Sequence, residues 1–443
     1  MTIFIIAFAC EPNRTSEPGV GWNIVGELAK HHELTVLTRC NNREDIEAYM
    51  AAHPDSPHGK IHWEYYDLAE WFHKLKKKVP CGIQLYQELW QRGAAKKYKD
   101  EFKKYDIVHH LTFGSIFFTP WAAQYTDRLV WGPIGGASGA MENAFLKNES
   151  LKSRVSEMFY RFVAWYSFHP APWAVRLRKK CRAVLFRTSE LASAVKLEPR
   201  QITAVIPETA YAGEIIPRQH KTDRHPLKIM SVGRLIPLKG VKYTIQAFAK
   251  FVESGGEGEL HIYGDGPLRR ELESLAFGVS NSNTETQRHR DTDGFPEGLK
   301  QCLCASAPLS LCDKNAFVSK ITFHGNVPNN EILTALDSAD VLIHSSFREG
   351  GSWTILEAMA HGVPVICQDR AGMKDMVTSE CGTKIAAATP EELITQFSAA
   401  LTKYYIDPNK ISRDGLNAKD RVRQNYIWSK CGEVLDSVFR GML

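Results

Sequence analysis

One stretch of the chain constrains its fold more than any other: residues 339–368, ADVLIHSSFREGGSWTILEAMAHGVPVICQ. It opens with an apolar run at 341–344, which has the length of a buried parallel strand. A small, polar segment with two adjacent glycines follows at 345–352 and predicts a loop. After a segment with helical periodicity comes a second apolar run at 363–367. The stretch therefore predicts a βαβ unit.

The helix of this unit has recognisable ends. Apolar side chains recur at helical spacing over residues 353–361, with Ser352 placed to cap the start and Gly362 to end it. In open α/β sheets, ligands bind at the carboxyl ends of the strands, where this loop lies. Free backbone amides near Gly350 and Gly351 would face an anion there.

Two glutamates occupy the loop and the helix. Glu349 and Glu357 are eight positions apart, about four of them helical, which separates the carboxylates by roughly 6 to 12 Å. That gap suits two hydroxyl-bearing groups on either side of a phosphate. A bare pair of this kind also fits a loop-capping Glu349 and a solvated Glu357 on an ordinary amphipathic helix.

Length and composition indicate a globular chain of two domains. With 443 residues, the chain is too long for one ordinary hydrophobic core. No apolar run approaches the roughly 20 residues that a membrane span needs, and residues 1–10 read as a first strand. We expect a cytoplasmic protein.

The first half of the chain also begins with a βαβ pattern. A strand is predicted at 2–8 and another at 34–37, with a glycine-containing loop and a helix between them. Gly19 and Gly21 in that loop could let a backbone amide approach a phosphate or a sugar, although a glycine pair before a helix also fits a plain turn. The strand at 106–110 ends in His109 and His110, and such a pair fits a site role as well as a structural one.

Two cations follow the first strand of the second half. Residues 227–232 predict that strand, and Arg234 and Lys239 come directly after it. Cationic side chains that converge at a strand's carboxyl edge suit a pyrophosphate.

Together these features resemble the retaining glycosyltransferases of family 4, whose signature is E-x7-E followed by EAMA-x-G-x-PV. The matching residues are Glu349, Glu357, Ala358, Met359, Ala360, Gly362, Pro364 and Val365. The resemblance covers nearly the whole chain and is densest over 227–377. It implies an α/β protein with the GT-B fold, in which two doubly wound Rossmann-like domains face each other across a cleft.

The resemblance also implies roles for single residues. The predicted catalytic residues are His109, His110, Arg234, Lys239 and Glu349. The predicted donor-binding residues are Gly19, Gly21, Gly233, Gly325, Val327, Gly350, Gly351, Ser352 and Glu357. Glu349 would hold hydroxyls of the sugar and Glu357 the ribose. The chain departs from the family at several places, among them the spacing of the two histidines, Val20 between two glycines, and Glu208 in place of asparagine after a proline. The first departure leaves open which histidine faces the acceptor.

The implied domain boundaries follow the motifs. An acceptor-side domain spans 1–212, a linker 213–226, a nucleotide-sugar-binding domain 227–410, and a helix crossing back to the first domain 411–443. Residues 278–319 form an insertion relative to the family, and its polar part, 280–298, is predicted to be disordered. The three cysteines of this insertion lack the partners of a zinc site.

The implied activity is transfer of a sugar from a nucleotide-sugar donor to a carbohydrate or lipid-linked acceptor, with retention, in cell-surface polysaccharide or glycolipid synthesis. The nucleotide sugar is a substrate, and we expect no cofactor, no metal requirement and no nucleic-acid partner. Two other classes stay open: a sugar-nucleotide epimerase with the same fold, and a non-catalytic subunit that binds a sugar nucleotide.

Basic residues are concentrated in one region. Residues 151–200 carry 11 basic and 3 acidic side chains, interleaved with aromatics. Such a stretch can lie on an anionic membrane surface, and this predicts peripheral contact with the inner face of the cytoplasmic membrane. An aromatic core helix followed by a solvated basic helix fits the same pattern.

Overall fold

The computed structural model of the chain describes residues 1–14, 16–72, 82–147, 149–215, 225–276 and 320–443. The insertion at 278–319, including its predicted disordered part and its three cysteines, lies outside these residues.

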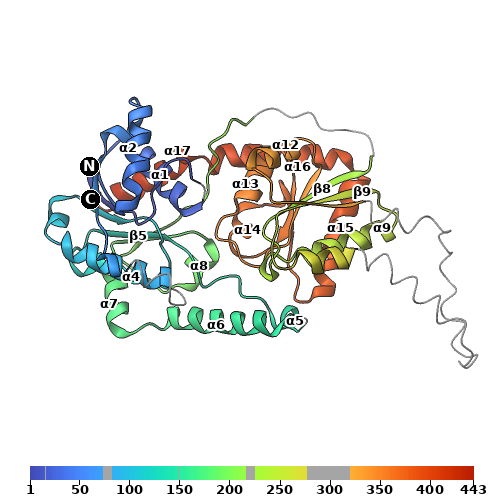
Figure 1. Cartoon of the computed structure of the whole chain (residues 1–443), viewed down its shortest axis with the longest axis horizontal. Coiled ribbons are helices and arrows are strands. Elements are labelled where there is room, and N and C mark those ends of the chain that lie inside the picture. The colour runs from blue at the N-terminus through green and yellow to red at the C-terminus, as the bar shows by residue number, and fades with distance from the viewer. Residues whose placement is uncertain (15, 73–81, 148, 216–224, 277–319) are drawn as a thin grey trace, which may run out of the picture.

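Two parallel β-sheets form the centres of two domains (Figure 1). The first has the strand order β3-β2-β1-β4-β5-β6-β7, with strands β1 Thr2–Ile6, β2 Glu33–Thr38, β3 His62–Tyr65, β4 Ile107–His110, β5 Leu129–Ile134, β6 Ala183–Phe186 and β7 Ile202–Val205. The second has the order β10-β9-β8-β11-β12-β13, with strands β8 Leu227–Val232, β9 Gly258–Tyr263, β10 Ile321–Gly325, β11 Val341–His344, β12 Val365–Gln368 and β13 Gly382–Ile385. The predicted pair of doubly wound domains is confirmed.

Helices cover both faces of each sheet, which explains why the central strands are apolar along their whole length. In the first part of the chain these are α1 Ser16–Leu28, α2 Arg43–Ala52, α4 Gly82–Lys97, α5 Asn143–Leu146, α6 Leu151–Phe168, α7 Pro172–Lys180 and α8 Ser189–Ala194. In the second part they are α9 Val241–Glu253, α12 Asn329–Leu336, α13 Trp353–Ala360, α14 Ala371–Met376, α15 Pro390–Ile406, α16 Pro408–Asn425 and α17 Trp428–Arg440. None of the described helices is long and apolar enough to cross a membrane.

Two segments that connect the domains, one around residue 211 and one around residue 427, run side by side. Tyr211 and Ile427 form a parallel bridge, and the Tyr211 N–H donates to the carbonyl of Tyr426 at 2.7 Å. Helix α16 packs with the second domain, whereas α17 packs against α1 of the first. The crossing therefore starts at Ile427, later than the predicted boundary at 411, because the apolar face of α16 fits against α13.

A second crossing runs through α5, which comes from the first half of the sequence. Phe145 of α5 is fully buried in the core of the second domain, where its ring lies 4.8 Å from that of Phe347. Helix α6 continues from this point along the lower edge of the molecule in Figure 1, below both domains. The two domains are thus linked at the Tyr211 bridge and again through α5.

Candidate functional site

The predicted βαβ unit has the predicted ends and turns. Ser352 caps α13, since its Oγ accepts a hydrogen bond from the Ile355 N–H at 3.3 Å. Gly362 follows the helix with φ of 71°, a left-handed conformation that favours glycine. The loop between β11 and α13 therefore lies at the carboxyl edge of the sheet, as expected.

Lys239 and Glu349 meet at this edge, although they are 110 positions apart in sequence. Lys239 follows β8 in a short turn, Glu349 follows β11, and their side chains form a part-buried ion pair. Gly240 sets the turn: its φ is 63°, and a Cβ there would lie 2.5 Å from the carbonyl oxygen of Ser345. His344 Nε2 lies 3.2 Å from the same carboxylate oxygen of Glu349.

The surroundings of Glu349 favour its charged form. Burial alone would raise the pKa of this carboxyl, but the hydrogen bond and charge of His344, and then those of Lys239, outweigh it and lower the pKa to about 2. Glu349 is therefore a carboxylate at neutral pH. It can accept hydrogen bonds from hydroxyl groups, and it holds the Lys239 ammonium in place.

The glycines next to Glu349 leave backbone donors available. Among the described residues, neither the Gly350 nor the Gly351 N–H has a hydrogen-bond acceptor, while the Ser352 N–H meets the Met376 sulfur at 3.5 Å. These amides lie just before the start of α13, whose dipole favours an anion.

Arg234, the other predicted cation, follows β8 directly. Its side chain is exposed and forms no ion pair or hydrogen bond with any described residue. Gly233 beside it has φ of 155°, and a Cβ there would lie 3.7 Å from the Lys239 side chain. Arg234 is thus free to turn towards a bound anion near Lys239.

The residues predicted to contact the nucleoside lie along the next strand ends. Glu357 on α13 accepts a hydrogen bond from Asn329 Nδ2 at 3.1 Å, and burial raises the pKa of its carboxyl. Gly325 at the end of β10 has φ of 72°, and its carbonyl accepts from the Gly264 N–H at 2.8 Å. Val327, two residues on, is partly buried against the core of the second domain.

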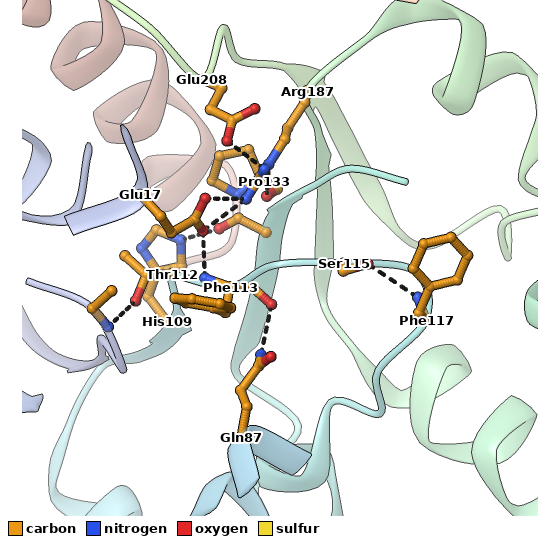
Figure 2. A network of polar contacts seen from close by, with 12 residues as sticks. Glu17, Gln87, His109, Thr112, Phe113, Ser115, Phe117, Pro133, Arg187 and Glu208 are labelled. Carbon is orange, nitrogen blue, oxygen red and sulfur yellow. Dashed lines mark hydrogen bonds and ion pairs between the residues drawn. The ribbon is translucent and has the colours of Figure 1, made fainter. Parts of the chain in front are cut away.

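The opposite wall of the cleft carries a charged group that the sequence did not reveal. Figure 2 shows the Arg187 guanidinium between two carboxylates. Its Nη2 donates to both oxygens of Glu17 at 2.7 and 3.0 Å, its Nη1 to Glu208, and its Nε to the Pro133 carbonyl at 3.1 Å. All three charged side chains are less than a fifth exposed. We call Glu17, Arg187 and Glu208 the acidic triad.

The acidic triad has one cation for two carboxylates. Burial raises the pKa of Glu208, and the neighbouring charge of Glu17 adds to this, so that the pKa reaches about 7 in spite of Arg187. The triad can therefore take up or release a proton near neutral pH.

The acidic triad faces the glycine loop of the second domain. A Cβ on Gly350 would lie 2.7 Å from Glu208 Oε2 and 3.8 Å from the Arg187 side chain. A cavity of about 270 Å³ lies between the domains here, with Arg187, Gly350 and Gly351 among its lining residues. Only one hint of this wall was visible in sequence, namely Glu208 where the family has asparagine.

Further contacts hold the domains against each other. The Ser189 N–H donates to Asp375 Oδ2 at 2.7 Å, and the Ala371 N–H donates to Glu190 Oε2 at 2.7 Å. Asp375 thus connects the two domains.

The structure buries both histidines, and contact of either with the acceptor stays a prediction. His109 is fully buried, its Nε2–H donates to the Gly132 carbonyl at 2.7 Å, and its ring lies edge-on to that of Phe439 of α17 at 5.6 Å. His110 is 3% exposed. Burial lowers the pKa of both to about 4, with the charge of His109 adding to the effect on His110, so both are neutral at pH 7.

The two glycines near the start of the chain also lie elsewhere than expected. Helix α1 begins at Ser16, so Gly19 and Gly21 belong to the helix and not to a loop before it. A Cβ on Gly21 would lie 2.3 Å from the Ala9 carbonyl oxygen and 2.7 Å from Thr112 Cγ2. Glycine at this position lets α1 pack closely on the strand ends, and contact of Gly19 and Gly21 with the donor stays a prediction.

Among the described residues, no group of three or more His, Cys, Asp or Glu side chains is arranged to hold a metal ion. The charged groups of the candidate site are the pair Lys239–Glu349, Arg234 and the acidic triad.

Comparison with known proteins agrees with this geometry. The family model described as glycosyl transferases group 1 matches residues 213–308 and 308–421. The putative colanic acid biosynthesis glycosyltransferase WcaL of Escherichia coli (strain K12) is 24% identical over 250 residues, which are 55% of this chain and 52% of that protein. The chain thus matches about half the length of this relative.

Solved structures match over the whole chain. The lipopolysaccharide outer core galactosyltransferase WaaB, in its apo form, is 14% identical with a TM-score of 0.57 and covers 100% of both chains. Anabaena Alr3699/HepE in complex with UDP-glucose is 13% identical with a TM-score of 0.51, again over 100% of both chains. Residues 213–421 of the chain thus match the glycosyl transferases group 1 family, and the whole chain has the GT-B fold.

Proposed function

We propose that this glycosyltransferase is a retaining, family 4 enzyme that moves a hexose from a nucleotide-sugar donor to a hydroxyl group of a carbohydrate or lipid-linked acceptor. The observation that carries the proposal is the ion pair of Lys239 and Glu349 beside the free amides of Gly350 and Gly351. This arrangement offers a cation, anion-binding N–H groups and a hydroxyl acceptor at one edge of the sheet.

The leaving group is a nucleoside diphosphate. In the transfer, the bond from the sugar's anomeric carbon to the diphosphate oxygen breaks, the acceptor oxygen bonds to the same face of that carbon, and the hydroxyl proton passes to the departing phosphate. Negative charge grows on the diphosphate, where Lys239, Arg234 and the two amides stabilise it. Lys239 and the two amides are held in place before the reaction, so they need little reorganisation, whereas Arg234 turns towards the bound diphosphate.

Glu349 positions the sugar. Its carboxylate stays ionised because the pKa is about 2, and it has acceptor sites beyond those used by Lys239 and His344. Hydroxyls of the bound hexose would donate to it, while Glu357, eight positions on, would accept from the ribose.

We propose that the reaction needs no divalent metal, because Lys239 and Arg234 supply the positive charge at the diphosphate. The match to a colanic acid glycosyltransferase supports a role in cell-surface polysaccharide or glycolipid synthesis. The complex of Anabaena Alr3699/HepE with UDP-glucose supports a uridine nucleotide as the first donor to test. We place the reaction in the cytoplasm.

A two-step experiment tests the proposal. A thermal-shift screen against UDP, GDP, ADP and their sugars identifies the donor, because a ligand that binds only the folded state raises its stability. Nucleotide release is then measured with and without an acceptor sugar, in EDTA and in Mg²⁺. We expect acceptor-dependent release with equal rates in both. An epimerised donor, or binding without turnover, would contradict the proposal, and a rate restored only by Mg²⁺ would contradict metal independence.

A further inference from the structure

Helix α6 exposes an unusually apolar face. Seven large apolar side chains on it are between 51% and 77% exposed: Leu151, Val155, Met158, Phe159, Phe162, Trp165 and Tyr166. Their spacing of three and four positions places them along one side of the helix. We call this set the α6 apolar face. Singly exposed apolar residues are common on protein surfaces, but a contiguous stripe of this length marks a contact surface.

The helix is firmly held on its other side, so the face is directed outwards. Arg348 Nη2 donates to both oxygens of the buried Glu157 at 2.9 Å, and the Arg348 guanidinium lies 3.3 Å from the ring centre of Tyr160. The Tyr160 hydroxyl donates to the Ser138 carbonyl at 2.7 Å. These contacts join α6 to both domains.

Unpaired positive charge flanks the α6 apolar face. Residues 151–182 carry eight basic side chains and one acidic side chain, and the acidic one is the buried Glu157. Lys152, Arg176 and Lys180 are exposed and form no hydrogen bond or ion pair through their side chains with any described residue. These three are the flanking cations.

Helix α7, which follows α6 in the chain, adds a basic depression. It has a volume of about 560 Å³ and is lined in part by Arg92, Arg176 and Lys180. The rings of Trp121 and Trp173 stack there at 5.2 Å, and Trp173 is half exposed. A depression with three cations and two indoles suits a phosphate group at an interface between water and lipid.

We propose that the α6 apolar face and the flanking cations bind the surface of an anionic lipid bilayer. Apolar and aromatic side chains would enter the acyl boundary, with the cations at the level of the headgroups. A second copy of the chain fits less well, because a two-fold contact through this face would bring the flanking cations of both copies together.

The structure also separates binding cations from structural ones. Arg178 donates to the carbonyls of Ser167 and Ile116, both at 2.6 Å, and Arg182 donates to that of Arg200 at 3.2 Å. Phe168, an aromatic of the same stretch, packs partly against the core of the first domain. These residues brace the fold and are therefore excluded from the test.

The test uses sedimentation with vesicles of phosphatidylcholine alone or in equal parts with phosphatidylglycerol, without any donor. We expect binding to the anionic vesicles that weakens with rising salt. The combined variant Met158→Gln, Phe162→Gln and Trp165→Gln should lower the affinity at least tenfold. The combined variant Lys152→Gln, Arg176→Gln and Lys180→Gln should also bind more weakly and show a smaller salt dependence.

The matched control replaces Ile406 and Leu416 by Gln, since both are as exposed as the α6 residues but lie on the second domain. It should bind like the unchanged chain. If the triple apolar variant fails to fold, Phe162→Gln alone should show a smaller loss. Equal binding to both kinds of vesicle, no binding at low salt, or a dimer in solution that the α6 variants dissociate would each overturn the proposal. None of these outcomes depends on the transfer reaction, which is measured separately.

Discussion

Two buried glutamates on opposite walls of the cleft have opposite proton affinities. Glu349 on the second domain has a pKa of about 2, and Glu208 on the first has a pKa of about 7. Both accept hydrogen bonds from a cationic side chain, so an ion pair alone does not decide whether the pKa is raised or lowered.

The number of charges around each carboxyl explains the difference. Glu349 is a single carboxylate beside Lys239 and His344, whereas Glu208 shares the one guanidinium of Arg187 with Glu17. Burial penalises both carboxylates, and only the first receives enough donors to overcome it. The second-domain wall can therefore bind an anion, whereas the first-domain wall carries excess negative charge.

The largest effect should follow from removing the cation shared by the acidic triad. Arg187→Met leaves Glu17 and Glu208 buried without a counter-charge, and we expect a loss of about 3 to 5 kcal/mol in the free energy of unfolding in urea. Arg39→Met is the matched control, because Arg39 is equally buried but pairs with one carboxylate, that of Glu11, at 3.4 Å. Equal losses for both variants would contradict the explanation that two carboxylates sharing one cation make Arg187 more important for stability.

On the other wall, Lys239→Ala should lower turnover by about 10² to 10³, the range seen when one donor to a developing charge is removed. Its fold, followed by circular dichroism, should persist. Lys250→Ala serves as control, since this exposed lysine on α9 forms, among the described residues, one side-chain hydrogen bond, to Thr395 Oγ1 at 2.8 Å. Near-normal turnover of the Lys239 variant would remove this residue from the proposed mechanism.

The smallest effect concerns pH. The pKa of Glu208 is raised from 4.5 to about 7, so the folded state keeps a proton that the unfolded chain releases, and this carboxyl lowers stability progressively as the pH rises from about 4.5 to 7. The pKa of Glu349 is lowered to about 2, so its stabilising contribution is complete above pH 4.5 and lost only below it.

Urea unfolding at pH 5, 6 and 7 distinguishes the two glutamates. We compare the free energy of unfolding of the unchanged chain with that of Glu208→Gln. The difference between them should fall by about 2 kcal/mol between pH 5 and pH 7. The corresponding difference for Glu349→Gln should stay constant. His109 and His110, whose pKa values burial lowers to about 4, contact neither glutamate, so their effect cancels in these differences. If the free energies of unfolding of both variants changed with pH in the same way, the two glutamates would not differ in proton affinity.

The second-domain wall was predictable from sequence because its residues are close in the chain or follow strands directly. Ser352, Gly350 and Glu349 form one loop, and Lys239 follows a strand that apolar periodicity identifies. Parallel strands bring such loops to one edge, so spacing along the chain translates into proximity.

The first-domain wall could not be predicted in this way. Glu17 and Arg187 are separated by 170 positions, and their contact depends on how α1 packs against the end of β6. Gly19 and Gly21 suggested a loop, but both lie in α1, where a Cβ on Gly21 would meet the Ala9 carbonyl and a Cβ on Gly19 that of Arg14. The adjacent His109 and His110 alternate across β4 and are buried there, and sequence alone does not show burial.

Helices α5 and α17 have a consequence for how the molecule can be divided. The first stretch of sequence supplies Phe145 to the second core, and the last stretch supplies Leu435 and Phe439 to the first. A chain cut at the linker would leave each half with a gap in its interior and an uncovered helix. We therefore expect the two domains to depend on each other for folding and to melt in a single transition.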